Sequence, residues 1–236
     1  MDFKKILKEK FNNYNILITD EQLQLLSCFH ENLLKYNDIH NLTRITDDND
    51  AIIKHYLDSI LPINIFKNNS KIIDIGCGGG FPSIPLKIMN NTLNITAIDS
   101  VNKKINFVES MKNSLNLRNF TAIHTRIEDL AHNKEYRESY DYAISRAVAP
   151  LNTIIEYSAP FLKNNGYIIS FKGSNYEEEL KMSENAMNKL NCELASIEKY
   201  FISELNTYRY VILIKKIKEN SNTYPRKNNK PRTQPL

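Results

Sequence analysis

The stretch Asp74-Ile75-Gly76-Cys77-Gly78-Gly79-Gly80-Phe81 decides the fold of this chain. It follows the apolar run 71–73, which predicts a short buried strand, and it precedes residues 82–89, which predict a helix. Glycine allows a sharp turn and a close approach of the backbone to a ligand, and the helix that follows offers unpaired N–H groups. Four of the chain's six glycines lie within residues 76–80. This concentration indicates a ligand-binding loop of the nucleotide type rather than a surface turn.

The spacing of the loop indicates which ligand it binds. A second predicted strand, 94–98, ends at Asp99, and an acid at this place in an α/β sheet binds ribose hydroxyls. Gly76 and Gly78 match the first two glycines of the dinucleotide fingerprint, but Phe81 occupies the third glycine position, which argues against NAD. The run fits the pattern D-x-G-x-G-x-G instead. It resembles the S-adenosylmethionine loop of the seven-stranded methyltransferases.

The length and composition are those of a globular protein with one sizeable core. The chain has 236 residues, and it contains no apolar run near the roughly 18 residues that a membrane span needs. The first residues do not form a signal peptide. Cys28, Cys77 and Cys192 are too few and too widely spaced for a disulfide framework or a metal site. We therefore expect a cytoplasmic protein with no metal and no membrane contact.

Positive charge is concentrated at the carboxyl end. Residues 215–236 contain seven Lys or Arg residues and one Glu, a local charge of +6, which leaves −2 for the remainder of a chain whose net charge is +4. Such asymmetry is typical of a segment that contacts a polyanion, and also of a disordered, solubilising end. The charge alone favours neither interpretation.

The amino-terminal part of the chain is predicted to be helical. Apolar residues recur at helical spacing over 2–12, and a capping box that begins at Thr19 predicts the start of a second helix. A third helix is expected over 51–61, with Asn49 or Asp50 as its cap. These helices form an extension ahead of the first strand.

From residue 71 onward, predicted strands and helices alternate, which indicates a mainly parallel sheet. The short connection between the last two strands predicts an antiparallel hairpin. The expected strands are 71–73, 94–98, 120–124, 140–145, 166–171, 192–202 and 208–217, and the helices between them include 102–115, 150–162 and 174–190. This order predicts an α/β, doubly wound, seven-stranded S-adenosylmethionine-dependent methyltransferase (Rossmann-like) fold. The expected units are a helical extension packed on the core in 1–65, a methyltransferase domain in 66–218 and a basic, flexible tail in 219–236.

Several segments together resemble one family. They are Asn41-Leu42-Thr43, His55-Tyr56-Leu57-Asp58-Ser59, Gly80-Phe81-Pro82-Ser83-Ile84-Pro85-Leu86, Ser145-Arg146-Ala147 and Tyr224-Pro225-Arg226-Lys227. The chain resembles the RsmG (GidB) family from about Tyr36 to Leu236, with the segments in the same order. That family is the bacterial 16S ribosomal RNA guanine-N7 methyltransferase. The chain departs from the family at Ser83, where glycine is common, and in its tail, which lacks the usual small residues.

The resemblance implies a cofactor, a target and a set of site residues. The cofactor is S-adenosyl-L-methionine, and the target is guanine 527, in the standard numbering, of free 16S rRNA or of a small subunit or its assembly intermediate. We expect the protein to act as a monomer, although the sequence does not fix the oligomeric state. The cofactor positions that the resemblance implies are Gly76, Phe81, Ile127, Glu128 and Arg146. The loop motif adds Gly78 and Asp99 as cofactor-binding residues. Without the resemblance, an exposed loop acid is the favoured interpretation of Glu128.

The implied chemistry needs no general base. Guanine N7 is an acceptor without a proton, so methyl transfer to it depends on positioning the two reactants. Arg146 and Lys172, at predicted strand ends, are expected to do this. The three cysteines fit structural roles, and we expect His55 to be a packing anchor. The residues expected to contact RNA are Arg126, Lys172, Arg209, Arg226 and Lys227.

Two other functions remain open on the sequence. One is a non-catalytic, RNA-binding ribosome assembly factor that retains the cofactor fold, and the other is a nicotinamide oxidoreductase, which Phe81 disfavours. If the tail contacts phosphates, removing residues 220–236 is expected to weaken RNA binding and flatten its salt dependence. The same truncation is expected to leave cofactor affinity unchanged.

Overall fold

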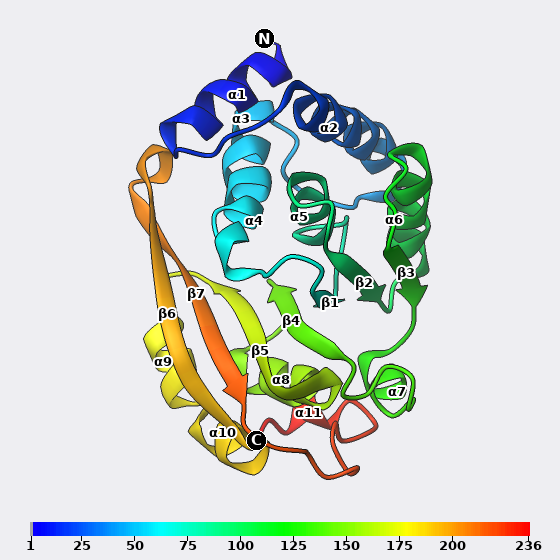
Figure 1. Cartoon of the computed structure of the whole chain (residues 1–236), viewed down its shortest axis with the longest axis vertical. Helices are drawn as coiled ribbons and strands as arrows, with labels where there is room; N and C mark the ends of the chain where they lie inside the picture. The colour runs from blue at the N-terminus through cyan, green and yellow to red at the C-terminus, as the bar shows by residue number, and fades with distance from the viewer. Residues whose placement is uncertain (1) are drawn as a thin grey trace.

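The computed structural model describes residues 2–236, which contain a seven-stranded sheet (Figure 1). The strand order is β3-β2-β1-β4-β5-β7-β6. The first five strands run parallel, β7 is antiparallel to β5, and β6 is antiparallel to β7. The strands are β1 (Lys71–Ile75), β2 (Asn94–Asp99), β3 (Phe120–His124), β4 (Tyr140–Arg146), β5 (Leu162–Lys172), β6 (Cys192–Ile202) and β7 (Thr207–Lys216). The predicted architecture, including the closing hairpin, is confirmed.

Helices cover both faces of the sheet (Figure 1). One face carries α1 (Phe3–Asn13), α2 (Asp20–His40), α5 (Ser83–Met89) and α6 (Asn102–Ser114). The other carries α7 (Ile127–Ala131), α8 (Leu151–Ser158), α9 (Tyr176–Lys181) and α10 (Glu184–Lys189). In β1, the fully buried Ile72 faces the first group and the fully buried Ile73 faces the second. A central parallel strand is covered on both sides, which explains why Ile72 and Ile73 are adjacent apolar residues instead of alternating with polar ones.

The amino-terminal helices share the core of the sheet domain. Phe29 of α2 lies with its ring centroid 5.1 Å from that of Phe81 and 6.1 Å from that of Phe107. The predicted capping box at the start of α2 is present, with Thr19 and Gln22 each accepting from the other's backbone amide. The extension therefore packs directly behind the glycine-rich loop, since Phe81 belongs to that loop.

The third helical segment starts earlier than predicted. It runs through α3 (Asp48–Ala51), a π-helical turn (Ile52–Leu57) and α4 (Asp58–Ile60). The cap is Asp47, whose side chain accepts from the amide of Asp50 at 3.0 Å. The prediction of Asn49 or Asp50 as the cap is therefore wrong, because several adjacent acids and amides offer equivalent caps and the sequence does not rank them.

The charged segment 174–190 forms two short helices rather than one. They are α9 and α10, separated at Met182 and Ser183. The Ser183 hydroxyl donates to the Glu179 carbonyl oxygen at 2.6 Å. A serine that bonds to the preceding turn competes with the backbone hydrogen bonds of a helix, which is consistent with the break at this position.

The carboxyl-terminal segment, residues 219–236, is packed on the domain, in contrast to the flexible tail that its composition predicts. It includes a short helix, α11 (Lys230–Thr233), within which Pro231 is buried. Arg137 donates to three carbonyl oxygens of this segment, and Arg226 pairs with Glu156. Glu156 is fully buried on α8, so it needs a cationic partner, and composition alone does not reveal that burial.

Among residues 2–236, no helix is long and apolar enough to cross a membrane.

Candidate active site

Three adjoining cavities lie where β1, β2, β4 and β5 end. The Asp99 cavity, of about 870 Å³, is bounded by Asp99, Glu128 and Tyr157. The Gly78 cavity (about 420 Å³) includes the glycine-rich loop, and the Lys172 cavity (about 500 Å³) lies beyond it. Ala147, which follows β4 with a φ of +55°, lines all three and so joins them into one groove. The groove lies beside the β1/β4 junction, where the strand order reverses and α/β sheets bind ligands.

The glycine-rich loop has the backbone conformation that its sequence predicts. Gly76 has a φ of +73° and Gly78 a φ of +58°, in the left-handed region that other residues rarely adopt. A Cβ atom on Gly76 would lie 2.8 Å from Cγ2 of Val148, whereas a Cβ atom on Gly78 would meet nothing within 4 Å. Gly76 is therefore required for packing, and Gly78 leaves open space for a ligand.

Asp99 holds the loop from the end of β2. Its Oδ2 accepts from the Gly78 amide at 3.0 Å, and its Oδ1 accepts from the Val101 amide at 2.9 Å. Lys104 Nζ lies 3.6 Å from Oδ2. Each carboxylate oxygen has two lone pairs, so both retain the capacity to accept from a ligand hydroxyl. Asp99 thus combines a structural role with the predicted ribose-binding position.

Asp74, the first residue of the motif, is fully buried in β1. Within the described residues, neither of its carboxylate oxygens has a hydrogen-bond partner. Burial raises the pKa of Asp74 to about 7. The Asp74 carboxyl does not line any of the three cavities, so it lies behind the glycine-rich loop and not on the ligand side.

Glu128 and Ile127 line the far side of the Asp99 cavity, in the first turn of α7. Glu128 is 8% exposed, so it is not the exposed loop acid that the sequence alone favours. Burial, followed by the charge of Glu128, raises the pKa of the neighbouring Tyr157 to about 12. The Tyr157 hydroxyl therefore stays protonated at neutral pH.

Arg146 is the centre of a buried polar network at the end of β4. Its Nη1 donates to the Lys54 carbonyl oxygen at 3.0 Å and pairs with Asp58 Oδ2 at 3.2 Å. Its Nη2 lies 3.1 Å from His55 Nδ1, and its guanidinium carbon lies 5.3 Å from the centroid of the Phe81 ring. Burial lowers the pKa of Arg146, and the nearby Asp58 carboxylate opposes this shift. The network fixes the wall between the Gly78 and Lys172 cavities.

His55 is neutral in this network. The Arg146 guanidinium can only donate, so Nδ1 of His55 accepts and its Nε2 carries the hydrogen, which faces Thr43 Oγ1 at 2.9 Å. Burial, and then the charge of Arg146, lowers the pKa of His55 to about 3. Its ring also stacks on Phe81, with 4.5 Å between centroids. The expectation that His55 is a packing anchor agrees with these contacts.

Phe81 has little surface left for a ligand. It is 6% exposed and lies in an aromatic cluster with Phe29, His55 and Tyr56. It lines the Gly78 cavity only with the remaining part of its ring. Its main effect is therefore to attach the loop to the amino-terminal helices.

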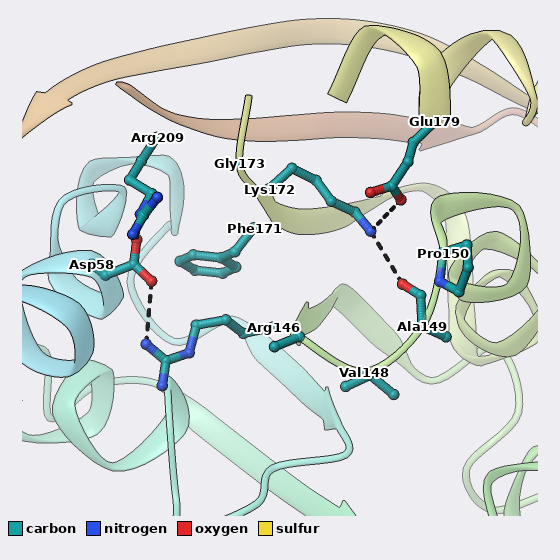
Figure 2. A pocket seen from close by; sticks show the side chains of 11 residues that line it. Asp58, Arg146, Val148, Ala149, Pro150, Phe171, Lys172, Gly173, Glu179 and Arg209 are labelled. Carbon is teal, nitrogen blue, oxygen red and sulfur yellow. Dashed lines mark hydrogen bonds and ion pairs between the residues drawn. The ribbon is translucent and has the colours of Figure 1, made fainter. Parts of the chain in front are cut away.

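The Lys172 cavity is lined by paired charges (Figure 2). Lys172 Nζ lies 2.7 Å from Glu179 Oε2 and 3.1 Å from the Ala149 carbonyl oxygen. On the opposite wall, Asp58 lies between Arg146 and Arg209, and Arg209 Nε is 3.4 Å from its Oδ1. The Lys172 side chain is 10% exposed, so it forms part of the cavity wall, which suits a positioning role better than a contact with phosphate.

Arg226, which the sequence predicts to contact RNA, has a partner inside the protein instead. Its Nε and Nη2 bond to the two carboxylate oxygens of Glu156 at 2.8 and 2.7 Å, and Nη2 also donates to the Gln234 carbonyl oxygen. Because these donors are used within the chain, the structure does not support a phosphate contact at Arg226. The residue anchors the carboxyl-terminal segment.

The structure brings most of the predicted residues into the groove. Arg126 caps α7 at the exposed edge of the Asp99 cavity, and Arg209 lies on the rim of the other two. Lys227 is exposed on the carboxyl-terminal segment, outside all three cavities. The residues gathered in the groove are Gly76, Gly78, Phe81, Asp99, Arg126, Ile127, Glu128, Arg146, Lys172 and Arg209.

Sequence reasoning missed Asp58 as a site residue, together with Ala147, Tyr157 and Arg232. Asp58 follows His55 by one helical turn, so the spacing contained a signal. Ala147 has a positive φ, which its sequence does not reveal. Arg232 lies 85 residues beyond Ala147 in the chain, and it reaches the Asp99 cavity through the folding of the carboxyl-terminal segment.

Two of the three cysteines, Cys77 and Cys192, are buried. Burial raises the pKa of Cys77 well above its usual value and that of Cys192 to about 12, so both remain thiols. Across residues 2–236, no group of three or more His, Cys, Asp or Glu side chains is placed to hold a metal ion.

Comparisons with known proteins identify the class and the family. TYW2 of M. jannaschii, solved in complex with AdoMet, superposes with a TM-score of 0.55 at 17% identity, over 73% of this chain and 78% of that one. A SAM-dependent methyltransferase from Aquifex aeolicus superposes with a TM-score of 0.54 at 15% identity, over 78% and 98% of the two chains. The fold is therefore that of the S-adenosylmethionine-dependent methyltransferases, as predicted.

The particular family follows from the sequence comparisons. Residues 22–208 match the family described as rRNA small subunit methyltransferase G (GidB). The ribosomal RNA small subunit methyltransferase G of Alkaliphilus oremlandii is 41% identical over the full length of both chains, and that of Lactobacillus acidophilus is 37% identical over 96% of each. The chain belongs to this family. The predicted family and the predicted cofactor, S-adenosyl-L-methionine, are confirmed.

The residues present fit this cofactor. The open space at Gly78 admits a ligand against the backbone, and Asp99 and Glu128 place two carboxylates on the walls of the neighbouring cavity. We infer that Asp99 and Glu128 hold the ribose and adenine part, and that Gly76 and Gly78 border the methionine part.

We expect replacement of Asp99 by alanine to weaken the binding of S-adenosylhomocysteine by roughly 10- to 150-fold, equivalent to about 1.5–3 kcal/mol for a lost charged hydrogen bond. Isothermal titration measures this directly. Asp141→Ala is the matched control, because the Asp141 carboxylate likewise accepts from a backbone amide, that of Lys71 at 2.8 Å, but at the opposite end of β1. Equal loss of affinity in the two variants would show that the Asp99 effect is not specific to the site.

Proposed function

We propose that this protein transfers a methyl group from S-adenosyl-L-methionine to N7 of a guanine in the 16S rRNA of the small ribosomal subunit, at position 527 in the standard numbering. Family membership supports a small-subunit rRNA substrate, because the relatives carry that substrate in their names. The choice of N7 is supported by the chemistry of the groove. Such a substrate also implies activity in the cytoplasm.

The observation that carries the N7 proposal is that, among the described residues, the groups lining the Gly78 and Lys172 cavities include no free base. His55 is neutral, with both ring nitrogens in hydrogen bonds. Asp58 pairs with two arginines, and Glu179 accepts from Lys172 and from the Leu151 amide. Methylation of an amine or a hydroxyl requires loss of a proton, whereas guanine N7 carries none.

The residues of the groove then act by binding and orientation. When bound, S-adenosyl-L-methionine supplies an electrophilic methyl group on a sulfonium. Because Gly78 has no side chain, the cofactor can lie against the backbone of the loop. Arg146 fixes the wall between the cofactor side of the groove and the Lys172 cavity. The Lys172 cavity receives the guanine. Asp58 and Glu179 place carboxylates around it, where they favour the positive charge that methylation leaves on the purine.

Basic side chains around the groove suit the RNA backbone. Arg126 and Lys227 are exposed and make no ion pair within residues 2–236. The Arg209 side chain is 31% exposed beside Asp58. Contacts of such residues with phosphates release counterions, so we expect RNA affinity to fall as salt rises.

The test is transfer of a tritiated methyl group from S-adenosyl-L-methionine to small subunits whose 16S rRNA lacks the modification. We expect label in 16S rRNA and, after digestion to nucleosides, in 7-methylguanosine. Label in another nucleoside would contradict the N7 assignment. Binding of subunits and S-adenosylhomocysteine without any transfer would instead identify the non-catalytic assembly factor.

A further inference from the structure

The carboxyl-terminal segment reaches the cofactor side of the groove. Asn229 and Arg232 line the Asp99 cavity together with Asp99, Glu128 and Tyr157. We propose that this segment forms one wall of the cofactor site and that Arg232 positions the loop after β4 for cofactor binding. The proposal rests on the assignment of the Asp99 cavity to the cofactor, but it does not depend on the RNA target.

The position of this wall is set by buried anchors on α8. Arg226 pairs with the fully buried Glu156, and the Thr153 hydroxyl donates to the Pro231 carbonyl oxygen at 2.9 Å. Pro231 is itself buried, immediately before Arg232. A buried carboxylate with a bidentate arginine partner is costly to separate, so the segment is held against the domain.

Arg232 connects this segment to the glycine-rich loop. Its Nη2 donates to the Val148 carbonyl oxygen at 3.0 Å. The side chain of Val148 packs on Gly76, since a Cβ atom at Gly76 would lie 2.8 Å from its Cγ2. Ala147, the residue before Val148, lines all three cavities. Arg232 thus fixes the loop that separates the Asp99 cavity from the rest of the groove.

The positive charges of the segment divide into two groups. Lys227 and Lys230 are exposed and make no side-chain hydrogen bond or ion pair in the described part of the chain. Arg232, although exposed over much of its length, bonds to Val148 and borders the cavity. The contacts of Arg232 indicate that it acts on the cofactor side. The proposal therefore replaces the sequence-based expectation that removing residues 220–236 leaves cofactor affinity unchanged.

The experiment compares Arg232→Ala with Lys230→Ala, which removes the same charge from the same helix without touching the cavity. Truncation is unsuitable, because it would leave the Glu156 carboxylate buried without Arg226. We expect Arg232→Ala to weaken S-adenosylhomocysteine binding roughly tenfold by isothermal titration, and Lys230→Ala to change it less than about twofold. The midpoint of thermal unfolding without ligand is expected to stay the same in both variants, which separates a role in binding from a general loss of stability.

Two results would overturn the proposal. One is S-adenosylhomocysteine affinity in Arg232→Ala that equals the wild-type value. The other is equal loss of affinity in Arg232→Ala and Lys230→Ala, which would indicate a non-specific charge effect. The titration contains no RNA, so a failure of the guanine-N7 proposal, seen as absent methyl transfer by the wild-type protein, is distinguishable from either result.

Discussion

Replacing Arg146 with alanine is expected to reduce methyl transfer to small-subunit RNA by at least about 100-fold, the scale of a misplacement of about 1 Å between reactants. The guanidinium bonds to the Lys54 carbonyl oxygen, Asp58 and His55, and Arg146 is one of the residues that line both the Gly78 and the Lys172 cavities. Its loss leaves the largely buried Asp58 carboxylate with Arg209, at 3.4 Å, as its remaining ion-pair partner among the described residues. Breaking a buried ion pair costs about 3–5 kcal/mol, so the free energy of unfolding is expected to fall as well.

Arg209→Ala is the matched control, because Arg209 also pairs with Asp58 but is 31% exposed and bonds at 3.4 Å. We expect its effect on stability to be within about 1 kcal/mol, as for exposed ion pairs. Transfer rates are measured in single turnover at saturating RNA, at a temperature where both variants are folded by circular dichroism. Equal transfer rates in folded Arg146→Ala and wild type would contradict the positioning role of Arg146.

Replacing Gly78 with valine is expected to abolish detectable binding of S-adenosylhomocysteine while the protein stays folded. A Cβ atom at this position meets no protein atom within 4 Å, so the side chain would occupy the space of the Gly78 cavity. The positive φ of Gly78 adds about 1–2 kcal/mol of backbone strain. Gly78→Asn separates the two effects, since asparagine tolerates this conformation and still fills the cavity.

Gly173→Val is the matched control for Gly78→Val, because it places the same side chain in the Lys172 cavity, on the guanine side of the groove. A Cβ atom at Gly173 also meets nothing within 4 Å, but this residue lines the Lys172 cavity. We expect Gly173→Val to bind S-adenosylhomocysteine normally and to lose methyl transfer. If Gly78→Asn bound the cofactor product as tightly as wild type, or if Gly173→Val lost that binding, the division of the groove into cofactor and guanine sides would be wrong.

Features that depend on local sequence were predictable. The apolar runs predicted the positions of the parallel strands. The glycine spacing predicted a sharp turn, in which Gly76 and Gly78 have positive φ. Asp99 was found because it ends a strand, and strand ends of a parallel sheet meet at one edge. Arg146 came from the family resemblance, and its position at a strand end agreed with it. These signals come from residues close together in the chain, so no knowledge of the tertiary structure was needed.

Features that depend on distant partners were not predictable. The positive φ of Ala147 and the hydrogen bond from Arg232 to Val148 result from packing, which leaves no mark on neighbouring residues. Arg226 appeared as a free positive charge because the burial of Glu156 on α8 is visible only in the fold. Composition predicted a flexible tail because it does not show this buried partner, whereas the structure has a tail that is anchored on α8.

The most direct test of the proposed function is to map 7-methylguanosine in 16S rRNA from cells with and without the gene for this protein. Borohydride reduction followed by aniline cleaves the chain at this nucleoside, and primer extension locates the break. We expect one break at guanine 527 that disappears on deletion and returns when the wild-type chain, but not Gly78→Asn, is supplied. A break at that guanine that persists in the deletion strain would contradict the account.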